Sequence, residues 1–288
     1  MNIQKYKQEK TKDSIIVIHI VAVVACIIAF VVIGFAIYYG SDEIDIKTSQ
    51  EKEEEKVIVK KEQLQENLLE RLENILYMYG ENNYTKANKQ ESLVYTSYKE
   101  KIELENTYSI NVYVPNINIE SEVVKSFNDK MKNTYIKKID QIKAKNTKTI
   151  MSMQYLATVQ NNILSVIVST DLKEDITSQR LLIETFNYDL KNDREISLEE
   201  YLNNNSNYNK ENIKKEVNDY VIEQKEKNSS LQELGFPVYK RDETSEIYNI
   251  KNTSHFFIDE NAIYLIYPYG NKENTREIDI VPIIKVDG

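Results

Sequence analysis

The chain has 288 residues and carries 46 acidic against 37 basic side chains, which gives a formal net charge of -9. An acidic surface argues against nucleic acid as a partner, because phosphate binding needs a basic patch. The single cysteine, Cys26, excludes a disulfide-linked fold and a site with several thiolate ligands.

An uncharged apolar run near the N-terminus begins at Ile15 and ends at Tyr39. Its 25 residues exceed the roughly 20 that cross the hydrocarbon core, so we expect one transmembrane helix over residues 14–39. Four lysines precede the run in residues 1–13, whereas acidic residues follow it from Asp42. The positive-inside rule therefore predicts a cell-membrane protein with residues 1–13 in the cytoplasm and the C-terminal part outside. Cys26 is expected to be one more apolar residue of this helix.

Residues 40–90 are expected to form a charged stalk that contains a helix. The first 20 or so are too polar and too charged to bury a core. Further along, apolar side chains recur at spacings of three and four and share one face of a helix that stops near Gly80. They are Leu64, Leu68, Leu72, Ile75 and Tyr79. This face fits either a short coiled coil that forms a homodimer or packing against the chain's own outer domain.

A strand and a helix are predicted for residues 91–160, which we interpret as an N-terminal module. Residues 109–114 alternate polar and apolar side chains, as in a half-buried strand, and Pro115 is expected to end that strand. Residues 121–145 are predicted to be a helix with one apolar face. Its members are Val123, Val124, Phe127, Met131, Tyr135 and Ile139.

Residues 161–288 are predicted to form a C-terminal α+β domain. Strands are expected at 150–160, 163–170 and 180–190, a helix at about 210–226, and two strands near the end. Asn161 and Asn162 suit the turn between the first two strands, because Asn tolerates left-handed backbone geometry. Strands joined in series by turns favour an antiparallel sheet, so the fold class is α+β, with helices packed on antiparallel sheet.

Three segments occur in an order that resembles a known architecture. They are residues 108–117, residues 186–201, and residues 256–269 followed by 277–282. Together they resemble the extracytoplasmic region of RsiV-like anti-sigma factors, which also forms the N-terminal module of PdaC-type peptidoglycan deacetylases. In the second segment Asp193 stands where that family usually has glycine, and Ser197 and Glu200 have the spacing of a helix capping box.

The resemblance implies a non-catalytic ectodomain that binds a protein ligand, since RsiV-like proteins bind lysozyme. Animal lysozymes are basic, so an acidic ectodomain suits such a ligand. Residues 1–13 are few for the helical segment that holds a sigma factor, so sigma-factor binding is not expected from them. The alternative is a membrane-anchored accessory protein of peptidoglycan metabolism that binds glycan or an enzyme.

No catalytic or metal site is expected. The chain has two histidines, and His19 falls within the apolar run, which leaves His255 alone outside it. Glu199 and Glu200 are adjacent on a helix, so they point in different directions and are expected to be solvated. No cofactor is expected either.

The best candidate for a ligand-binding surface is the tyrosine-rich stretch near the C-terminus, because tyrosine gives a large contact area at a low entropic cost. Alternation along a strand places Tyr267 and Tyr269 on one face. The predicted site comprises Tyr264, Tyr267, Pro268, Tyr269, Asn271 and Lys272. The competing interpretation is that these tyrosines belong to the core.

Overall fold

The computed structural model describes residues 47–74, 92–145, 148–206, 208–236, 238–269 and 277–284. The chain divides into two compact units, residues 1–58 and residues 59–288. In the described ranges, no helix is long and apolar enough to cross a bilayer. The apolar run from Ile15 to Tyr39, as well as Asn271 and Lys272, lies outside those ranges.

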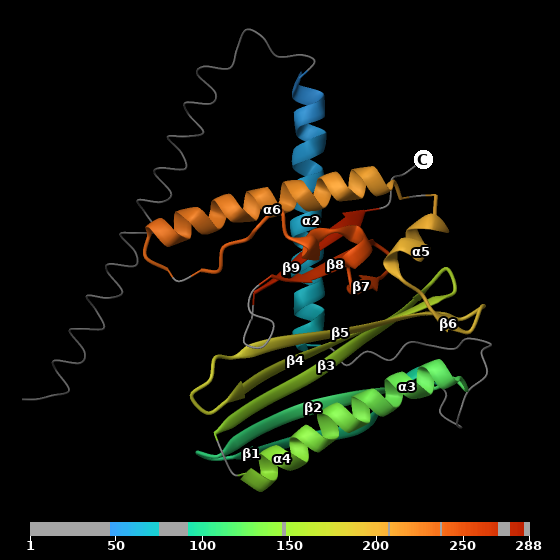
Figure 1. Cartoon of the computed structure of the whole chain (residues 1–288), viewed down its shortest axis with the longest axis vertical. Coiled ribbons are helices and arrows are strands. Elements are labelled where there is room, and N and C mark those ends of the chain that lie inside the picture. Colours follow the sequence, from blue (N-terminus) through green and yellow to red (C-terminus); the bar gives the residue numbers. More distant parts are fainter. Residues whose placement is uncertain are drawn as a thin grey trace, which may run out of the picture. The chain divides into compact units, whose positions relative to one another are not determined.

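The larger unit contains a six-stranded sheet with the order β1-β2-β3-β4-β5-β6 (Figure 1). Its strands are β1 (Val94–Leu104), β2 (Tyr108–Ile117), β3 (Thr149–Gln160), β4 (Ile163–Glu174), β5 (Arg180–Asp189) and β6 (Arg194–Glu195). Neighbouring strands are antiparallel except β2 and β3, which are parallel. The sheet is therefore mixed, which corrects the expectation of a purely antiparallel one.

The parallel step follows from the helical connection between β2 and β3, since parallel neighbours need a long crossover. This connection consists of α3 (Glu122–Met131), a π-helical turn η1 (Lys132–Ile136) and α4 (Lys137–Lys145). The predicted apolar face is confirmed, because Val124, Phe127, Met131, Tyr135 and Ile139 are buried against one face of the sheet. The extra residue in the π turn keeps these side chains on one side of the helix.

Two details of the first strands differ from the sequence-based expectation. β1 has no counterpart among the predicted strands, because its outer half is charged and exposed, as suits the edge of a sheet. β2 continues through Pro115 instead of ending there. Pairing with β3 stops at Val112, and β1 bulges between Thr96 and Tyr98 opposite the proline, so Pro115 lies in an irregular part of the ladder.

A second sheet contains β7 (His255–Ile258), β8 (Ala262–Pro268) and β9 (Ile278–Ile284), all antiparallel. The late strands number three rather than the predicted two, because a turn separates β7 from β8. The carboxylate of Asp259 holds this turn by accepting the N–H groups of Asn261 at 2.8 Å and Ala262 at 3.0 Å. An aspartate that accepts N–H groups two and three residues ahead is a common turn device.

Buried polar side chains join the two sheets. Asn187 Nδ2 donates to the carbonyl of Phe256 at 2.8 Å, and the N–H of Ile258 donates to Ser165 Oγ at 3.0 Å. Thr158 Oγ1 donates to the carbonyl of Ile258. β7 therefore satisfies backbone groups with side chains of β3, β4 and β5. The expected boundary between residues 160 and 161 falls inside one sheet, because β3 and β4 pair along their whole length across it.

The helix α2 (Lys47–Asn74) contributes its second half to the larger unit. Leu64, Leu68 and Leu72 are buried in a cluster with side chains of both sheets, including Leu156 and Tyr264. Of the two alternatives for this apolar face, packing within the chain is the one that the structure shows. Residues 59–74 therefore belong to the compact unit and not to a stalk.

The remaining elements cover the outer face of the second sheet. They are α5 (Leu198–Asn203), α6 (Lys210–Glu233), and the short 3-10 turns η2 (Glu246–Tyr248) and η3 (Ile250–Asn252). The larger unit is thus layered from α3 and α4 through the two sheets to α6 (Figure 1). A core lies between each pair of layers.

Candidate functional site: a groove beside helix α6

The predicted tyrosine surface is not exposed. Tyr264 and Tyr267 are each 1% accessible, because β8 is the central strand of its sheet and both of its faces are covered. Tyr264 packs with the α2 leucines on one face, and Tyr267 packs in the α6 core on the other. The rings serve as core side chains, so they do not offer the contact area that the prediction required.

Tyr269 lies at the end of this strand and is half-buried. Its ring stacks on the guanidinium of Arg241, with 4.1 Å between Arg241 Cζ and the ring centroid. Burial, more than the neighbouring charges, raises the pKa of Tyr269 to about 12. Pro268 beside it is half-buried, so the predicted surface is reduced to the margin of a packed region.

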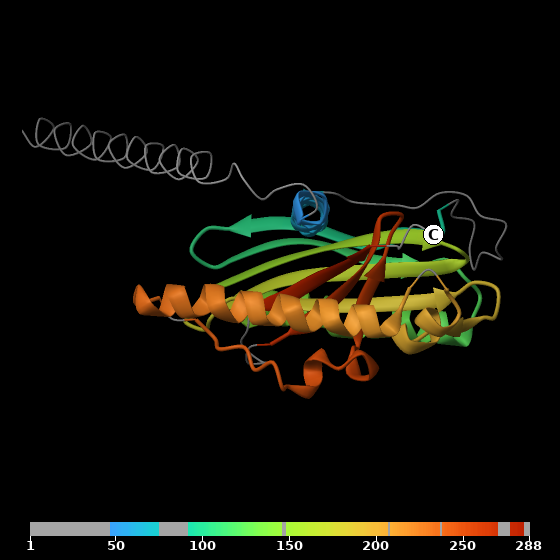
Figure 2. The same cartoon turned by 90° about the horizontal axis from the view of Figure 1, so that it is seen from above.

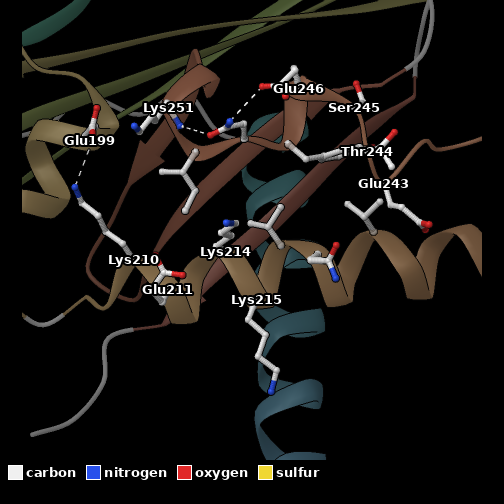
Figure 3. Close-up of a pocket in the computed structure, with 16 residues that line it drawn as sticks. Glu199, Lys210, Glu211, Lys214, Lys215, Glu243, Thr244, Ser245, Glu246 and Lys251 are labelled. Atoms are coloured by element: carbon white, nitrogen blue, oxygen red, sulfur yellow. Dashed lines mark hydrogen bonds and ion pairs between the residues drawn. The ribbon is translucent and has the colours of Figure 1, made fainter.

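A groove of about 600 Å³ opens nearby, between α6 and the segment 243–251 (Figure 3). We call it the α6 groove. It is lined by Glu199, Lys210, Glu211, Lys214, Lys215, Val217, Asn218, Val221, Glu243, Thr244, Ser245, Glu246, Tyr248, Asn249, Ile250 and Lys251. Its volume falls within the range of ligand-binding clefts, which is about 300–1,000 Å³.

The floor of the α6 groove is apolar. Val217 and Val221 come from successive turns of α6, and Tyr248 and Ile250 come from the opposite segment. Val217, Val221 and Tyr248 are buried, and Ile250 packs against the same core. Floor and core are therefore continuous, so the groove has a fixed base.

The rim of the α6 groove is charged, and its acidic and basic side chains differ in whether they form ion pairs within the protein. Lys210 reaches Glu199 at 3.7 Å, as Figure 3 shows, and Glu243 is bound by Lys225 at 2.9 Å. By contrast, Lys214 and Lys251 form no ion pair with another described residue. The carboxylates are thus partly neutralised by the protein, while these ammonium groups can contact a ligand.

A buried ion pair fixes the segment that forms the far wall. Arg241 Nε lies 2.9 Å from Asp279 Oδ2, and Arg241 Nη2 lies 2.8 Å from Asp279 Oδ1. Arg241 Nη1 also donates to the carbonyl of Gln224 at 3.2 Å. One guanidinium therefore joins the segment after α6 to both β9 and α6 itself, in the bidentate geometry that arginine and carboxylate favour.

Tyr248 connects this ion pair to the groove floor. Its hydroxyl donates to Asp279 Oδ2 at 2.9 Å, and its ring packs against Tyr267 with 5.2 Å between the centroids. Burial raises the pKa of Tyr248 strongly, and the nearby Asp279 carboxylate raises it further. The phenol therefore remains protonated and continues to donate at any physiological pH.

His255, Glu199 and Glu200 each contact a neighbouring side chain of the protein. His255 begins β7, with Nδ1 3.5 Å from Thr185 Oγ1. Glu200 closes the capping box with Ser197 and binds Arg194 at 2.7 Å, whereas Glu199 faces Lys210. In the described part of the chain, no three His, Cys, Asp or Glu side chains are grouped to hold a metal ion.

A smaller pocket of about 380 Å³ lies at the C-terminal end of α5, whereas the α6 groove touches the N-terminal end of that helix. The smaller pocket is lined by the β3–β4 turn and the β5–β6 turn. Amide side chains dominate its wall, and Asp189 and Lys191 add charge. The amides are Asn161, Asn162, Asn192, Asn204 and Asn205. Asn161 and Asn162 both have positive φ, 51° and 64°, so the predicted turn at these residues is confirmed. We call this the amide pocket.

The sequence alone does not reveal the α6 groove, because its two walls come from separate segments of the chain. The spacing of Val217 and Val221 marks an apolar face on α6, but nothing local shows that residues 243–251 leave part of that face open. Lys214 and Lys251 look like ordinary surface lysines in the sequence. Only the fold shows that they face one hollow.

The chain is similar to two solved structures of proteins from the DUF3298 family. For the protein from Pseudomonas aeruginosa, the sequence identity is 12%, the TM-score is 0.36, and the alignment covers 67% of this chain and 88% of that one. For the protein from Bacteroides fragilis, the identity is 14%, the TM-score is 0.36, and the coverage is 62% and 81%. No protein-family profile matches the chain, and no curated protein matches it.

Proposed function

We propose that the chain is a membrane-anchored, non-catalytic binding protein of the cell envelope, and that its α6 groove holds a segment of a polypeptide partner. The observation that carries this proposal is the groove itself, a hollow of about 600 Å³ with an apolar floor and a charged rim. A partner side chain would contact Ile250, the half-buried residue of the floor, while its flanking groups meet the rim. An apolar centre within a polar rim is the usual anatomy of a protein interface.

The length of the groove suits an extended peptide. Its α6 wall extends from Lys210 to Val221, which is about 17 Å at 1.5 Å per residue. About five extended residues cover that distance. A small metabolite would leave much of the floor uncovered, and a nucleic acid would meet the carboxylates of the rim.

A basic lysozyme is the first partner to test. The net charge of -9 steers a cationic protein toward the chain, and the sequence resemblance gives the same ligand class. Two lysines of the groove oppose the binding of such a partner, because Lys214 and Lys251 repel a cationic segment. Reversing either charge should therefore strengthen the binding of a basic partner and weaken that of an acidic one.

The test is a calorimetric titration of the full chain in lipid nanodiscs with a basic animal lysozyme. Ile250→Ser places a hydroxyl on the floor and should weaken binding by about tenfold, which corresponds to about 1.4 kcal/mol. Lys214→Glu should tighten binding. Ile176→Ser is the matched control, since Ile176 is 95% exposed and is not part of the groove.

Three results are informative. An equal loss of lysozyme affinity in the Ile250 and Ile176 variants would indicate that the contact lies outside the groove. No heat from a folded sample would eliminate this lysozyme as the partner. Binding that is weakened by Lys214→Glu would contradict a cationic segment in the groove and indicate a partner with carboxylates.

The amide pocket supports a second function, the binding of peptidoglycan glycan. Amide groups both donate and accept, so they match the hydroxyl and acetamido groups of such sugars. Full chain in nanodiscs should then co-sediment with purified peptidoglycan, and Asn204→Ala combined with Lys191→Ala should reduce the sedimented fraction. Unchanged sedimentation of that double variant would exclude the amide pocket as the glycan site.

A further inference from the structure

The second half of α6 has no buried residue. Ile213, Val217 and Val221 are the buried residues of this helix, and residues 222–233 continue it for about three further turns. At 1.5 Å per residue this part extends about 18 Å. Figures 1 and 2 show this end of α6 reaching past the ends of the strands, with the chain turning back beneath it.

Four large apolar side chains gather at this end, and we call them the α6 tip. Leu231 is 41% exposed, Leu234 74%, Phe236 57% and Tyr239 45%. So many exposed apolar side chains in one short segment are unusual on a surface that is otherwise charged. Elsewhere in the described chain, the large exposed apolar residues are single in the sequence, apart from the pair Ile102 and Leu104.

The α6 tip has a defined backbone. Gly235 has φ +85°, its N–H donates to the carbonyl of Gln232 at 2.9 Å, and the N–H of Phe236 donates to the carbonyl of Leu231 at 3.1 Å. These two bonds form a Schellman motif, which brings the side chains of Leu231 and Phe236 together. Asn228 Nδ2 donates to the carbonyl of Tyr239 at 3.0 Å, so the returning segment is held beside the helix.

The ion pairs near the α6 tip lie within the protein and do not identify a charged partner. Two lysines before the tip are paired within the protein, Lys225 with Glu243 at 2.9 Å and Lys227 with Glu223 at 2.7 Å, and the exposed Lys240 follows Tyr239. The exposed side chains of the tip are mainly leucine, phenylalanine and tyrosine, with the carboxylate of Glu233 between Leu231 and Leu234. Aromatic and leucine side chains on a polar body are the composition of segments that rest in the interfacial layer of a bilayer.

We infer that the α6 tip inserts into the interfacial layer of the membrane to which the chain is anchored. This inference rests on the membrane anchor of the proposed function. Only the segment 40–58 separates Tyr39, the end of the apolar run, from Val59, where the compact unit begins. The segment reaches at most about 42 Å, because its residues 47–58 are helical and extend about 18 Å, while the other seven span at most about 24 Å. The tether keeps the tip at a high effective concentration near the bilayer, so a weak insertion is sufficient.

The absence of tryptophan from the sequence makes the inference directly testable. Phe236→Trp places the only tryptophan of the chain at the α6 tip, and Ile176→Trp places it at a remote exposed position. Each variant of the full chain is reconstituted into phosphatidylcholine vesicles, with or without spin-labelled phosphatidylcholine as a quencher. Leu234→Trp is a second reporter at the tip, and circular dichroism confirms that each variant is folded.

The expected result is blue-shifted emission from the tip tryptophans, with several-fold quenching by the spin-labelled lipid, while Ile176→Trp remains unshifted and unquenched. Unquenched, water-exposed emission from both tip variants would overturn the inference. Blue-shifted emission without lipid quenching would also overturn it, because the tip would then be covered by protein. Flotation with the vesicles tests the anchor separately, so failure of the anchor and failure of the insertion are distinguishable.

Discussion

The guanidinium of Arg241 contacts both carboxylate oxygens of Asp279, and both side chains are buried. The same guanidinium holds the segment that follows α6 against the carbonyl of Gln224. The far wall of the α6 groove therefore depends on this pair.

Removal of one member of the pair should destabilise the larger unit. Arg241→Met leaves the Asp279 carboxylate buried without its cation, which costs about 3–5 kcal/mol. Urea unfolding followed by circular dichroism measures the loss. The double variant Arg241→Met with Asp279→Leu removes both charges and should recover most of the stability; a double variant as unstable as the single one would contradict this explanation.

Leu68 should contribute strongly to stability, because it is fully buried between α2 and the two sheets. Leu68→Ala should lower the free energy of unfolding by about 2–5 kcal/mol. Val59→Ala is a control on the same helix, since Val59 is exposed. Analytical ultracentrifugation should show the same association state for both variants, whereas dissociation of a dimer by Leu68→Ala would restore the coiled-coil alternative.

The stability of the protein should decrease on mild acidification because of His255. Burial lowers the pKa of His255, with Glu184 opposing the shift and Lys130 adding to it. Below about pH 6.5 the unfolded chain therefore binds more protons than the folded one. The free energy of unfolding decreases as the pH is lowered, until the pH is below the pKa of His255 in the folded protein. His255→Gln should reduce this loss when urea midpoints are compared at about pH 7.5 and pH 5.5. Equal slopes for the two proteins would refute the prediction.

Ser197 should stabilise the start of α5. Its hydroxyl accepts the N–H of Glu200 at 3.3 Å, and Glu200 Oε2 accepts the N–H of Ser197 at 3.2 Å. Ser197→Ala should cost about 1 kcal/mol of unfolding free energy, and Ser197→Gly only a few tenths. The melting temperatures of the two variants measure this difference. A lower melting temperature for Ser197→Gly than for Ser197→Ala would contradict the capping role of Ser197.

Features that depend on neighbouring residues were predictable from the sequence. The capping box of Ser197 and Glu200, the turn at Asn161 and Asn162, and the apolar face of residues 121–145 are all found. Asp193, which stands at an expected glycine position, has φ +52° and so adopts the geometry that glycine favours. In each case the physical cause acts over a few residues.

Features that depend on distant partners were not predictable in this way. The parallel pairing of β2 with β3 and the far wall of the α6 groove both join segments that share no local pattern. Tyr264 and Tyr267 show the same limit, because alternation places them on opposite faces of a strand but cannot show that both faces are covered. A run such as residues 262–267, apolar at every position, is typical of a strand buried on both sides.

The position of α2 in the chain has a consequence for biosynthesis. Arg71 binds Asp259 at 2.8 Å, across a separation of 188 residues. At about 5–20 residues per second, the ribosome needs on the order of 10–40 s to make the chain between them. Through nearly all of that interval the leucine face of α2 has been synthesised, but the second sheet, which completes its burial, has not. The element that opens the compact unit is thus among the last to reach its native packing, and it is where a chaperone has the longest time to bind.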